Sequence, residues 1–309
     1  MEPIVPFEPV LTEQIPSGAH WVAQVKWDVV RILTYCNGQT LRLFNRKLNE
    51  RTAQYPELQP IHRYCSASSV ILDGEMIAFT AGKPSFYEIM RRDSIRKLDN
   101  LEKAKREVSI TYMIFDILFY NGEWILEQPL EERQSLLQKI ISLQPDIQLV
   151  QNFPNGEHLF QAIQTQGMEG IVCKDRTSTY RLGGEDARWQ KYKNYRDLIA
   201  AIGGFTLQSG VVNSVLMGLY DHAGSFWYIG HSGTGRLTQQ DWRDLTATLQ
   251  PLVIKECPFV AKPQRTNEAF WVKPSLTAKI QFAEWTPHRT LRQASIQAFV
   301  SVPLELCTF

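Results

Sequence analysis

The stretch Gln24-Val25-Lys26-Trp27-Asp28-Val29-Val30-Arg31 is the starting point for predicting the fold. Its β-branched and apolar residues predict a half-buried strand, from whose end Lys26 would project into a concavity. Burial removes solvation from an ammonium group and lowers its pKa, so that more of the amine is free to attack an electrophile. Lys26 is therefore a candidate covalent nucleophile. The alternative, a lysine that lies along an edge strand with its amine in water, stays open for this stretch alone.

Length and composition limit the class of protein. The chain has 309 residues, which is more than one hydrophobic core usually organises, so we expect two domains. The net charge of +1 means that a polyanion would be bound by a local basic patch. Five separated cysteines without a C-x-x-C pair argue against a disulfide framework or a zinc site, and favour a reducing cytoplasm. The sequence has no secretory leader and no run of eighteen apolar residues, so we expect no membrane association.

Several segments predict strands that would carry polar groups at their ends. The runs 32–35 and 41–44 flank Asn37-Gly38, a strong hairpin signal, and Arg46 follows the second run. In the apolar segment 69–79, Asp73-Gly74-Glu75 predicts a turn-like break between two apolar runs. Carboxylates in such surroundings are costly unless they meet a cation or a metal.

A core strand and several helices follow. Residues 111–120, which include Phe115, are too apolar for an edge strand. Helix-start chemistry and apolar spacing predict four helices, at residues 85–92, 129–141, 158–166 and 238–249.

Charged groups at two further strands complete the candidate site. Glu169 begins one apolar strand and Lys174 ends it. Lys191 and Lys193 alternate with aromatic residues at the period of a strand, so both ammonium groups would point to one side, where they could grip a phosphate.

The residue pattern changes after Asn194. Short strands with one helix fill the remaining part of the chain, as in a small Greek-key barrel of the type that binds oligonucleotides. We therefore place a domain boundary near residue 196. The predicted strands are residues 198–205, 214–220, 226–230, 271–273 and 278–285.

Together the strand-end groups form a site of mixed charge. It has enough cations for a triphosphate, two glutamates for Mg²⁺ and an aromatic ring to stack on a base. The sequence lacks a G-x-x-x-x-G-K-[ST] loop, so a nucleotide would not be held by a P-loop. The candidate residues are Lys26, Asp28, Arg31, Arg46, Glu75, Phe115, Glu169, Lys174, Lys191 and Lys193.

These residues also carry a family resemblance. Lys26-Trp27-Asp28-Val29-Val30-Arg31 resembles the K-x-D-G-x-R motif of covalent nucleotidyltransferases. Four further segments resemble the later motifs of that superfamily and occur in the same order. They are Asp73-Gly74-Glu75, Phe115-Asp116, Glu169-Gly170-Ile171-Val172-Cys173-Lys174 and Trp189-Gln190-Lys191-Tyr192-Lys193. Five ordered motifs are a specific signal, and they span much of the chain. The chain is most similar to bacterial ATP-dependent DNA ligases of the end-joining ligase D type, whose barrel domain is resembled by Trp271-Val272-Lys273-Pro274 and Phe282-Ala283-Glu284-Trp285-Thr286.

The resemblance implies an α+β fold and a three-step reaction. An ATP-grasp-like adenylation (nucleotidyltransferase) domain with antiparallel sheets would occupy residues 1–196, and an OB-fold β-barrel residues 197–309. Lys26 would attack the α-phosphate of ATP to form lysyl-AMP. The AMP would pass to the 5′-phosphate at a nick, and the 3′-hydroxyl would then displace it and seal the strand in DNA repair.

The resemblance also implies a role for each site residue. Phe115 would stack on adenine, and Val25 and Lys174 would help to bind the nucleotide. Arg31 and Arg46 would steady the ribose and phosphates, and Glu75 would contact the ribose or a metal. Glu169 would hold Mg²⁺, Asp28 would assist the nucleophile or a second metal, and Lys191 and Lys193 would neutralise the α-phosphate in the transition state.

Two departures from the family pattern keep alternatives open. Val29 stands where the motif has glycine, and a β-branched residue replaces glycine poorly where φ > 0 or close backbone approach is needed. Arg289-Thr290-Leu291-Arg292 resembles the start of the last motif, but Ala298 to Pro303 replace its basic residues. The alternatives are a relative impaired in adenylation that seals only pre-adenylated ends, an RNA ligase and a capping-type guanylyltransferase.

The resemblance also implies cofactors, partners and location. The expected nucleotide is ATP, with Mg²⁺ or alternatively Mn²⁺. The expected partners are nicked double-stranded DNA and end-joining proteins, and we expect a monomer in the bacterial cytoplasm, associated with the nucleoid. Barrel and groove cations, including Arg236, Arg243 and Lys273, would grip the DNA.

Overall fold

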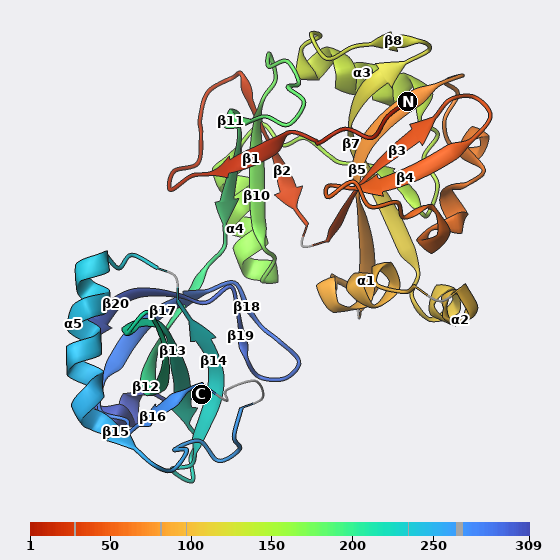
Figure 1. Cartoon of the computed structure of the whole chain (residues 1–309). Coiled ribbons are helices and arrows are strands. Elements are labelled where there is room, and N and C mark those ends of the chain that lie inside the picture. The colour runs from red at the N-terminus through yellow and green to blue at the C-terminus, as the bar shows by residue number, and fades with distance from the viewer. Residues whose placement is uncertain (28, 81, 97, 234, 264–267) are drawn as a thin grey trace. The chain divides into compact units, whose positions relative to one another are not determined.

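The computed structural model divides into two compact units, Met1–Asn194 and Tyr195–Phe309 (Figure 1). Each unit has its own hydrophobic core and is described separately. The structure describes residues 1–27, 29–80, 82–96, 98–233, 235–263 and 268–309.

The larger sheet of the first unit has the strand order β4-β3-β5-β7-β8, with β6 beside β5 and β9 beside β7. Its pairs are antiparallel except for the parallel pair β7–β9. The hairpin predicted around Asn37-Gly38 and the predicted core strand are both confirmed. The strands are β3 (Val30–Cys36), β4 (Leu41–Asn45), β5 (Val70–Thr80), β6 (Lys83–Pro84), β7 (Ile110–Tyr120), β8 (Glu123–Trp124) and β9 (Ile147–Leu149).

The turn-like break predicted at Asp73-Gly74-Glu75 is wrong, because β5 runs through these residues without interruption. The carboxylate of Asp73 is fully buried but meets the guanidinium of Arg31 at 2.6 Å, which removes the cost of burying it alone. Gly74 is required at the centre of the strand because a Cβ there would clash with the ring of Tyr112. The expectation that the buried carboxylate of Asp73 meets a cation is thus confirmed, and the expected break in the strand is not.

A second, smaller sheet has the order β1-β11-β10-β2. Its strands are β1 (Glu8–Leu11), β2 (Trp21–Lys26), β10 (Gly170–Asp175) and β11 (Glu185–Lys193). The proline-rich segment before residue 20 contributes β1, which pairs in parallel with β11. Pro9 hides this strand in the sequence, but β1 lies at the sheet edge, where a residue without a backbone N–H is tolerated.

Four α-helices accompany these sheets: α1 (Phe86–Asp93), α2 (Leu98–Glu107), α3 (Leu130–Ile140) and α4 (Gly156–Gln166). Ser85 and Asn155 cap α1 and α4 by accepting hydrogen bonds from the backbone N–H groups of Glu88 and His158. The sequence reading did not predict α2, whose surface is strongly charged. Leu101 and Ala104 of this helix are nevertheless buried, so a narrow apolar side anchors it.

The second unit is a β-barrel of the OB type with one α-helix, α5 (Gln239–Leu249). The strand path is β14-β13-β12-β16-β15, and β17 joins β12 to β20. A capping box between Thr238 and Asp241 starts the helix where the sequence predicts it. The strands are β12 (Arg196–Gln208), β13 (Val211–Tyr220), β14 (Phe226–Ser232), β15 (Val253–Ile254), β16 (Phe270–Val272), β17 (Thr277–Phe282), β18 (Glu284–Trp285), β19 (Leu291–Arg292) and β20 (Ser295–Val300).

The segment that replaces the last basic motif is part of this barrel. Leu291 and Arg292 form β19, which pairs with β18, and residues 298–300 belong to β20, which pairs with β17. This part of the chain therefore contributes backbone pairing to the barrel.

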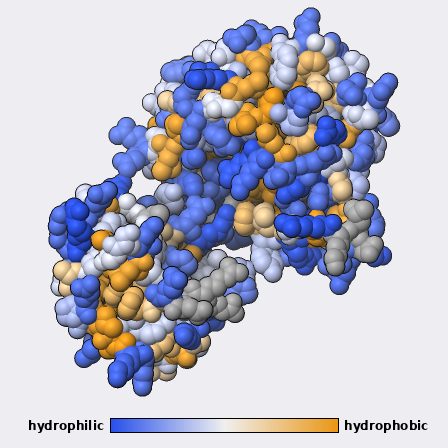
Figure 2. Space-filling model, in the orientation of Figure 1, coloured by the Kyte–Doolittle hydropathy of each residue, from blue (hydrophilic) through white to orange (hydrophobic). Residues whose placement is uncertain are grey.

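Hydrophilic side chains cover most of the visible surface of both units, with smaller hydrophobic patches between them (Figure 2). Within the residues that the structure describes, no helix has both the length and the apolar character that a membrane span needs.

Candidate active site

The strand register of the small sheet places Lys26 and Lys193 on either side of the same residue, Gly170. Gly170 pairs with Lys26 of β2 on one side and with Lys193 of β11 on the other. A Cβ at Gly170, whose φ is +151°, would collide with the carbonyl oxygen of Tyr192, so only glycine allows this approach. Glu169 precedes this glycine and is therefore held between the two lysines.

The carboxylate of Glu169 bridges both lysines. Lys26 Nζ donates to Glu169 Oε2 at 2.7 Å, and Lys193 Nζ lies 3.6 Å from Glu169 Oε1. Burial lowers the pKa of Lys193, and the nearby Glu169 partly opposes that effect. Lys191 lies two residues before Lys193 in the same strand, so its side chain leaves the same face. The structure thus gathers three of the predicted cations along adjacent strands.

A cavity with an empty volume of about 380 Å³, including its mouth, lies beside the strand end that carries Lys26. Val25 and Trp27, the neighbours of Lys26, line it; Lys26 itself does not, but its charge acts on the lining residue Glu75. The cavity lies between residues of the small and large sheets of the first unit. Of the candidate residues, Val25, Arg31, Glu75, Phe115 and Lys174 line it. The other lining residues are Pro9, Gln24, Trp27, Val150, Val172 and Trp189.

Two buried groups of this cavity have strongly shifted pKa values. Burial raises the pKa of Glu75 to about 7, although the positive charges of Lys26 and Arg31 act against it. Burial also lowers the pKa of Lys174 to about 7. The Lys174 amine lies 3.8 Å from the ring centroid of Phe115 and 4.0 Å from that of Trp189. Both groups can therefore change protonation near neutral pH.

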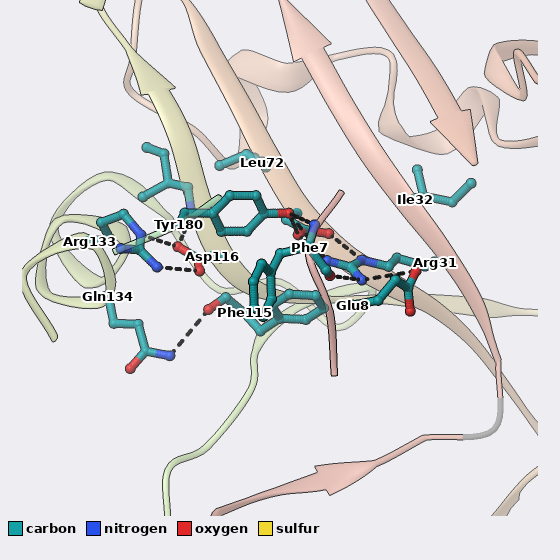
Figure 3. Close-up of polar contacts among 12 residues, drawn as sticks. Phe7, Glu8, Arg31, Ile32, Leu72, Phe115, Asp116, Arg133, Gln134 and Tyr180 are labelled. Carbon is teal, nitrogen blue, oxygen red and sulfur yellow. Dashed lines mark hydrogen bonds and ion pairs between the residues drawn. The ribbon is translucent and has the colours of Figure 1, made fainter. Parts of the chain in front are cut away.

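Arg31 is fixed by several acceptors (Figure 3). Its guanidinium donates to both carboxylate oxygens of Asp73, at 2.9 and 2.6 Å, and to the carbonyl oxygen of Phe7 at 2.7 Å. The hydroxyl of Tyr180 donates to the same carboxylate at 2.9 Å. Burial alone would lower the pKa of Arg31, but Asp73, together with Tyr180 and Glu8, outweighs it and holds the pKa above its ordinary value. Arg31 therefore presents a permanent, well-positioned cation to the cavity.

Other candidate residues lie outside the cavity lining or cannot be placed. Lys26, Glu169, Lys191 and Lys193 are not among the described residues that line the cavity. Arg46 is exposed in the turn after β4 and is not among the described residues that line the cavity. Asp28 lies outside the described residues.

The sequence reading missed several cavity residues, of which Gln24, Trp27 and Trp189 are the most informative. Gln24 stands two positions before Lys26 in the same strand, so strand alternation could have placed both side chains on one face. The indole N–H of Trp27 is buried and has no hydrogen-bond partner among the described residues. An unused buried donor in a cavity is explained if a ligand supplies the acceptor.

The cavity suits a nucleotide, and Glu75 in its wall, with Glu169 nearby, suits a magnesium ion shared with phosphates. Fixed cations, aromatic rings and the unused Trp27 donor match the charges, base and oxygens of a nucleoside triphosphate. The described residues contain no cluster of three or more metal-binding side chains. Mg²⁺ commonly takes one or two carboxylates and completes its shell with water and substrate phosphates, which Glu75 and Glu169 can accommodate.

Comparison with protein families identifies the fold and its class. The ATP dependent DNA ligase domain matches residues 8–193, and the ATP dependent DNA ligase C terminal region matches residues 208–300. The chain belongs to the ATP-dependent DNA ligases. The family resemblance expected from the five motifs is confirmed.

Several curated DNA ligases are similar in sequence. The multifunctional non-homologous end joining DNA repair protein LigD of Mycobacterium tuberculosis is 30% identical over 287 residues, which is 90% of this chain and 36% of that protein. DNA ligase 2 of Thermofilum pendens is 28% identical over 320 residues, covering 91% of this chain and 51% of that protein. The chain thus spans between about a third and about half of the length of these relatives.

Solved structures agree with the two-part fold. The ligase domain of M. tuberculosis LigD is 28% identical with a TM-score of 0.52, and the match covers 96% of this chain and 95% of that one. A mycobacterial DNA ligase D complexed with ATP and MES gives a TM-score of 0.54 at the same identity and coverage. The expected α+β fold, a nucleotidyltransferase domain followed by an OB-fold domain, is confirmed.

Proposed function

We propose that this ligase seals nicks in double-stranded DNA with ATP, through an AMP group carried covalently on Lys26. The observation that carries the proposal is the position of Lys26 beside the cavity, 2.7 Å from a carboxylate that also faces Lys193. A carboxylate that accepts the hydrogen bond of the amine orients the nitrogen lone pair once the proton has left.

In the first step Lys26 Nζ attacks the α-phosphorus of ATP, a P–N bond forms and pyrophosphate leaves. Phe115 stacks on the adenine, while Val25 and Lys174 complete its pocket. Lys191 and Lys193 neutralise the charge that develops on the α-phosphate.

The remaining contacts position the ends of the nucleotide. Arg31 and Glu75 reach the ribose from the cavity wall. Arg46, which lies on the exposed turn after β4 and does not line the cavity, would reach phosphates that extend beyond it, and Asp28 would assist the amine. Glu75 and Glu169 would hold Mg²⁺, or Mn²⁺ in its place, which would supply further neutralisation of phosphate charge.

In the later steps an oxygen of the 5′-phosphate at the nick attacks the carried AMP, which frees Lys26. The 3′-hydroxyl then attacks that phosphate, AMP leaves and the strand is closed. Cations of the second unit, Arg236, Arg243 and Lys273, bind backbone phosphates of the DNA. We further propose a role in repair beside end-joining proteins, in keeping with the name of the mycobacterial relative. We also propose that the protein acts as a monomer in the cytoplasm near the nucleoid.

The test is incubation with ATP labelled at the α-phosphate, followed by a nicked duplex. We expect an acid-labile label on the protein, loss of label in Lys26→Ala, and retention of label in the control Lys103→Ala, whose lysine is exposed on α2. Label without sealing, or label in Lys26→Ala, would contradict the proposal. Sealing of pre-adenylated nicks without any label would instead select the adenylation-impaired relative, and label from GTP a capping-type enzyme.

A further inference from the structure

The indole N–H of Trp27 is a buried hydrogen-bond donor without an acceptor. Trp27 directly follows Lys26 in the chain and lines the cavity of the first unit. Among the described residues of this unit, no other buried side-chain nitrogen or oxygen lacks a hydrogen-bond partner. An indole nitrogen can only donate, and a buried donor left unpaired lowers the stability of the fold. The position of this N–H is therefore explained by an acceptor that a ligand of the cavity brings.

The charged donors of the same cavity wall already have partners. The guanidinium of Arg31 donates to the carboxylate of Asp73 and to the carbonyl oxygen of Phe7, as Figure 3 shows. The amine of Lys174 lies 3.8 and 4.0 Å from the centroids of two aromatic rings, which hold it by cation–π contact. Of these three donors, the Trp27 N–H is the one that has no partner in the described part of the chain.

In the proposed complex two of the three parts of the nucleotide already have partners. The base stacks on Phe115 in the cavity wall. The phosphates meet Lys26 and the two lysines of β11, which are not among the described residues of the cavity lining, so the phosphates lie at the mouth. The positive charge of Lys26 also acts on Glu75, which places this carboxylate toward the mouth, where the ribose joins the first phosphate. The sugar is therefore the part left for Glu75 and Trp27.

We propose that Trp27 recognises the sugar of the nucleotide: its indole N–H donates to the oxygen of a ribose hydroxyl whose own O–H donates to Glu75. This inference rests on the proposed use of ATP in the cavity. A hydroxyl can donate one hydrogen bond and still accept another, whereas an ionised carboxylate can only accept. The two side chains thus satisfy both sides of one hydroxyl group. A deoxynucleotide without that hydroxyl would leave Glu75 and Trp27 unpaired in a buried wall and would be rejected.

The test measures self-labelling from ATP, 2′-deoxy-ATP and 3′-deoxy-ATP above pH 7, because the pKa of Glu75 is about 7 and its carboxylate must be ionised. The parent should favour ATP over one of the two analogues by roughly 10- to 100-fold per unit of nucleotide concentration, and that analogue identifies the hydroxyl. Trp27→Phe keeps an aromatic ring and removes the donor. It should slow labelling from ATP roughly five- to tenfold and leave labelling from the rejected analogue nearly unchanged. Trp124→Phe is the matched control, because Trp124 on β8 is 47% exposed and is not among the described residues of the cavity lining.

Nucleotide binding to the Lys26→Ala protein separates this inference from the proposed function, because no covalent step follows. In nuclear magnetic resonance spectra of that protein, the indole N–H signal of Trp27 should move downfield with ATP and stay in place with the rejected analogue. That shift, or a calorimetric preference for ATP that is lost in Trp27→Phe, would support the inference even if the parent formed no label.

Three results would overturn the inference. The first is equal binding of ATP and both analogues. The second is a preference for ATP that Trp27→Phe leaves unchanged. The third is an equal loss of affinity for ATP and both analogues in Trp27→Phe, because the indole would then serve another part of the nucleotide. Absence of any ATP binding would contradict the proposed function as well.

Discussion

Removing one partner of the ion pair between Arg31 and Asp73 should be among the most destabilising single changes in the first unit. Asp73 is completely buried, and the Arg31 side chain is 9% exposed. Asp73→Asn keeps the shape of the side chain but leaves the Arg31 cation buried without its main counter-charge. Breaking a buried pair in this way costs about 3–5 kcal/mol.

The same chain offers a matched control. Arg63 and Asp146 also form a two-bond pair, at 2.9 and 2.7 Å, but their side chains are 34% and 27% exposed. Asp146→Asn should therefore cost below about 1 kcal/mol, since solvent screens the pair. The geometry of the two pairs is alike, so any difference in cost reports burial.

Thermal unfolding followed by circular dichroism measures both variants. For a unit of this size the Asp73→Asn melting temperature should fall by roughly 6–20 °C, and that of Asp146→Asn by a few degrees at most. Arg31→Met should also destabilise the protein, and the double variant should cost roughly 2 kcal/mol less than the sum of the single ones. Equal shifts for the two aspartate variants, or purely additive costs in the cycle, would refute the reasoning.

Three further predictions concern catalysis, pH and DNA. Val29→Gly restores the motif's glycine and should speed self-labelling from ATP in single-turnover kinetics; a slower or unchanged rate would show that the valine is no hindrance. Because burial lowers the pKa of Lys174 from 10.5 to about 7, the unfolded chain binds more protons between these values. The free energy of unfolding should thus rise with pH over that window. Between pH 7.5 and pH 9.5, the urea midpoint of Lys174→Met should therefore rise less than the urea midpoint of the parent protein. Lys273→Ala should lower the slope of log affinity for nicked DNA against log salt by about one, whereas an unchanged slope would exclude a phosphate contact.

Much of the candidate site was predictable because its signals are local. β-Branched and apolar residues predicted the strand of Lys26, and Asn37-Gly38 predicted the hairpin that follows. Glu169 and Lys193 were recognisable as charges at strand ends. Such patterns depend on neighbours within a few positions, which the sequence displays directly.

Other features depended on partners far apart in the chain. Pairing of β1 with β11 joins Glu8 to Glu185, and no local pattern announces a parallel partner so distant. The acidic residues between two apolar runs suggested a break at Asp73-Gly74-Glu75. The Arg31 cation that makes the burial of Asp73 acceptable comes from another strand, so the local sequence does not show it.

By itself the sequence identified the family and placed Lys26, Glu169 and Lys193 at the ends of strands. It also showed which of these side chains are cationic and which is anionic. Only the tertiary structure decided which of these groups are buried and which atoms meet. It set the pKa of Glu75 and Lys174 near 7 and joined Gln24, Asn152 and Gln134, from three separate segments, through hydrogen bonds. The physical reason is that desolvation and hydrogen-bond direction depend on the surrounding atoms, which packing brings together from distant parts of the chain.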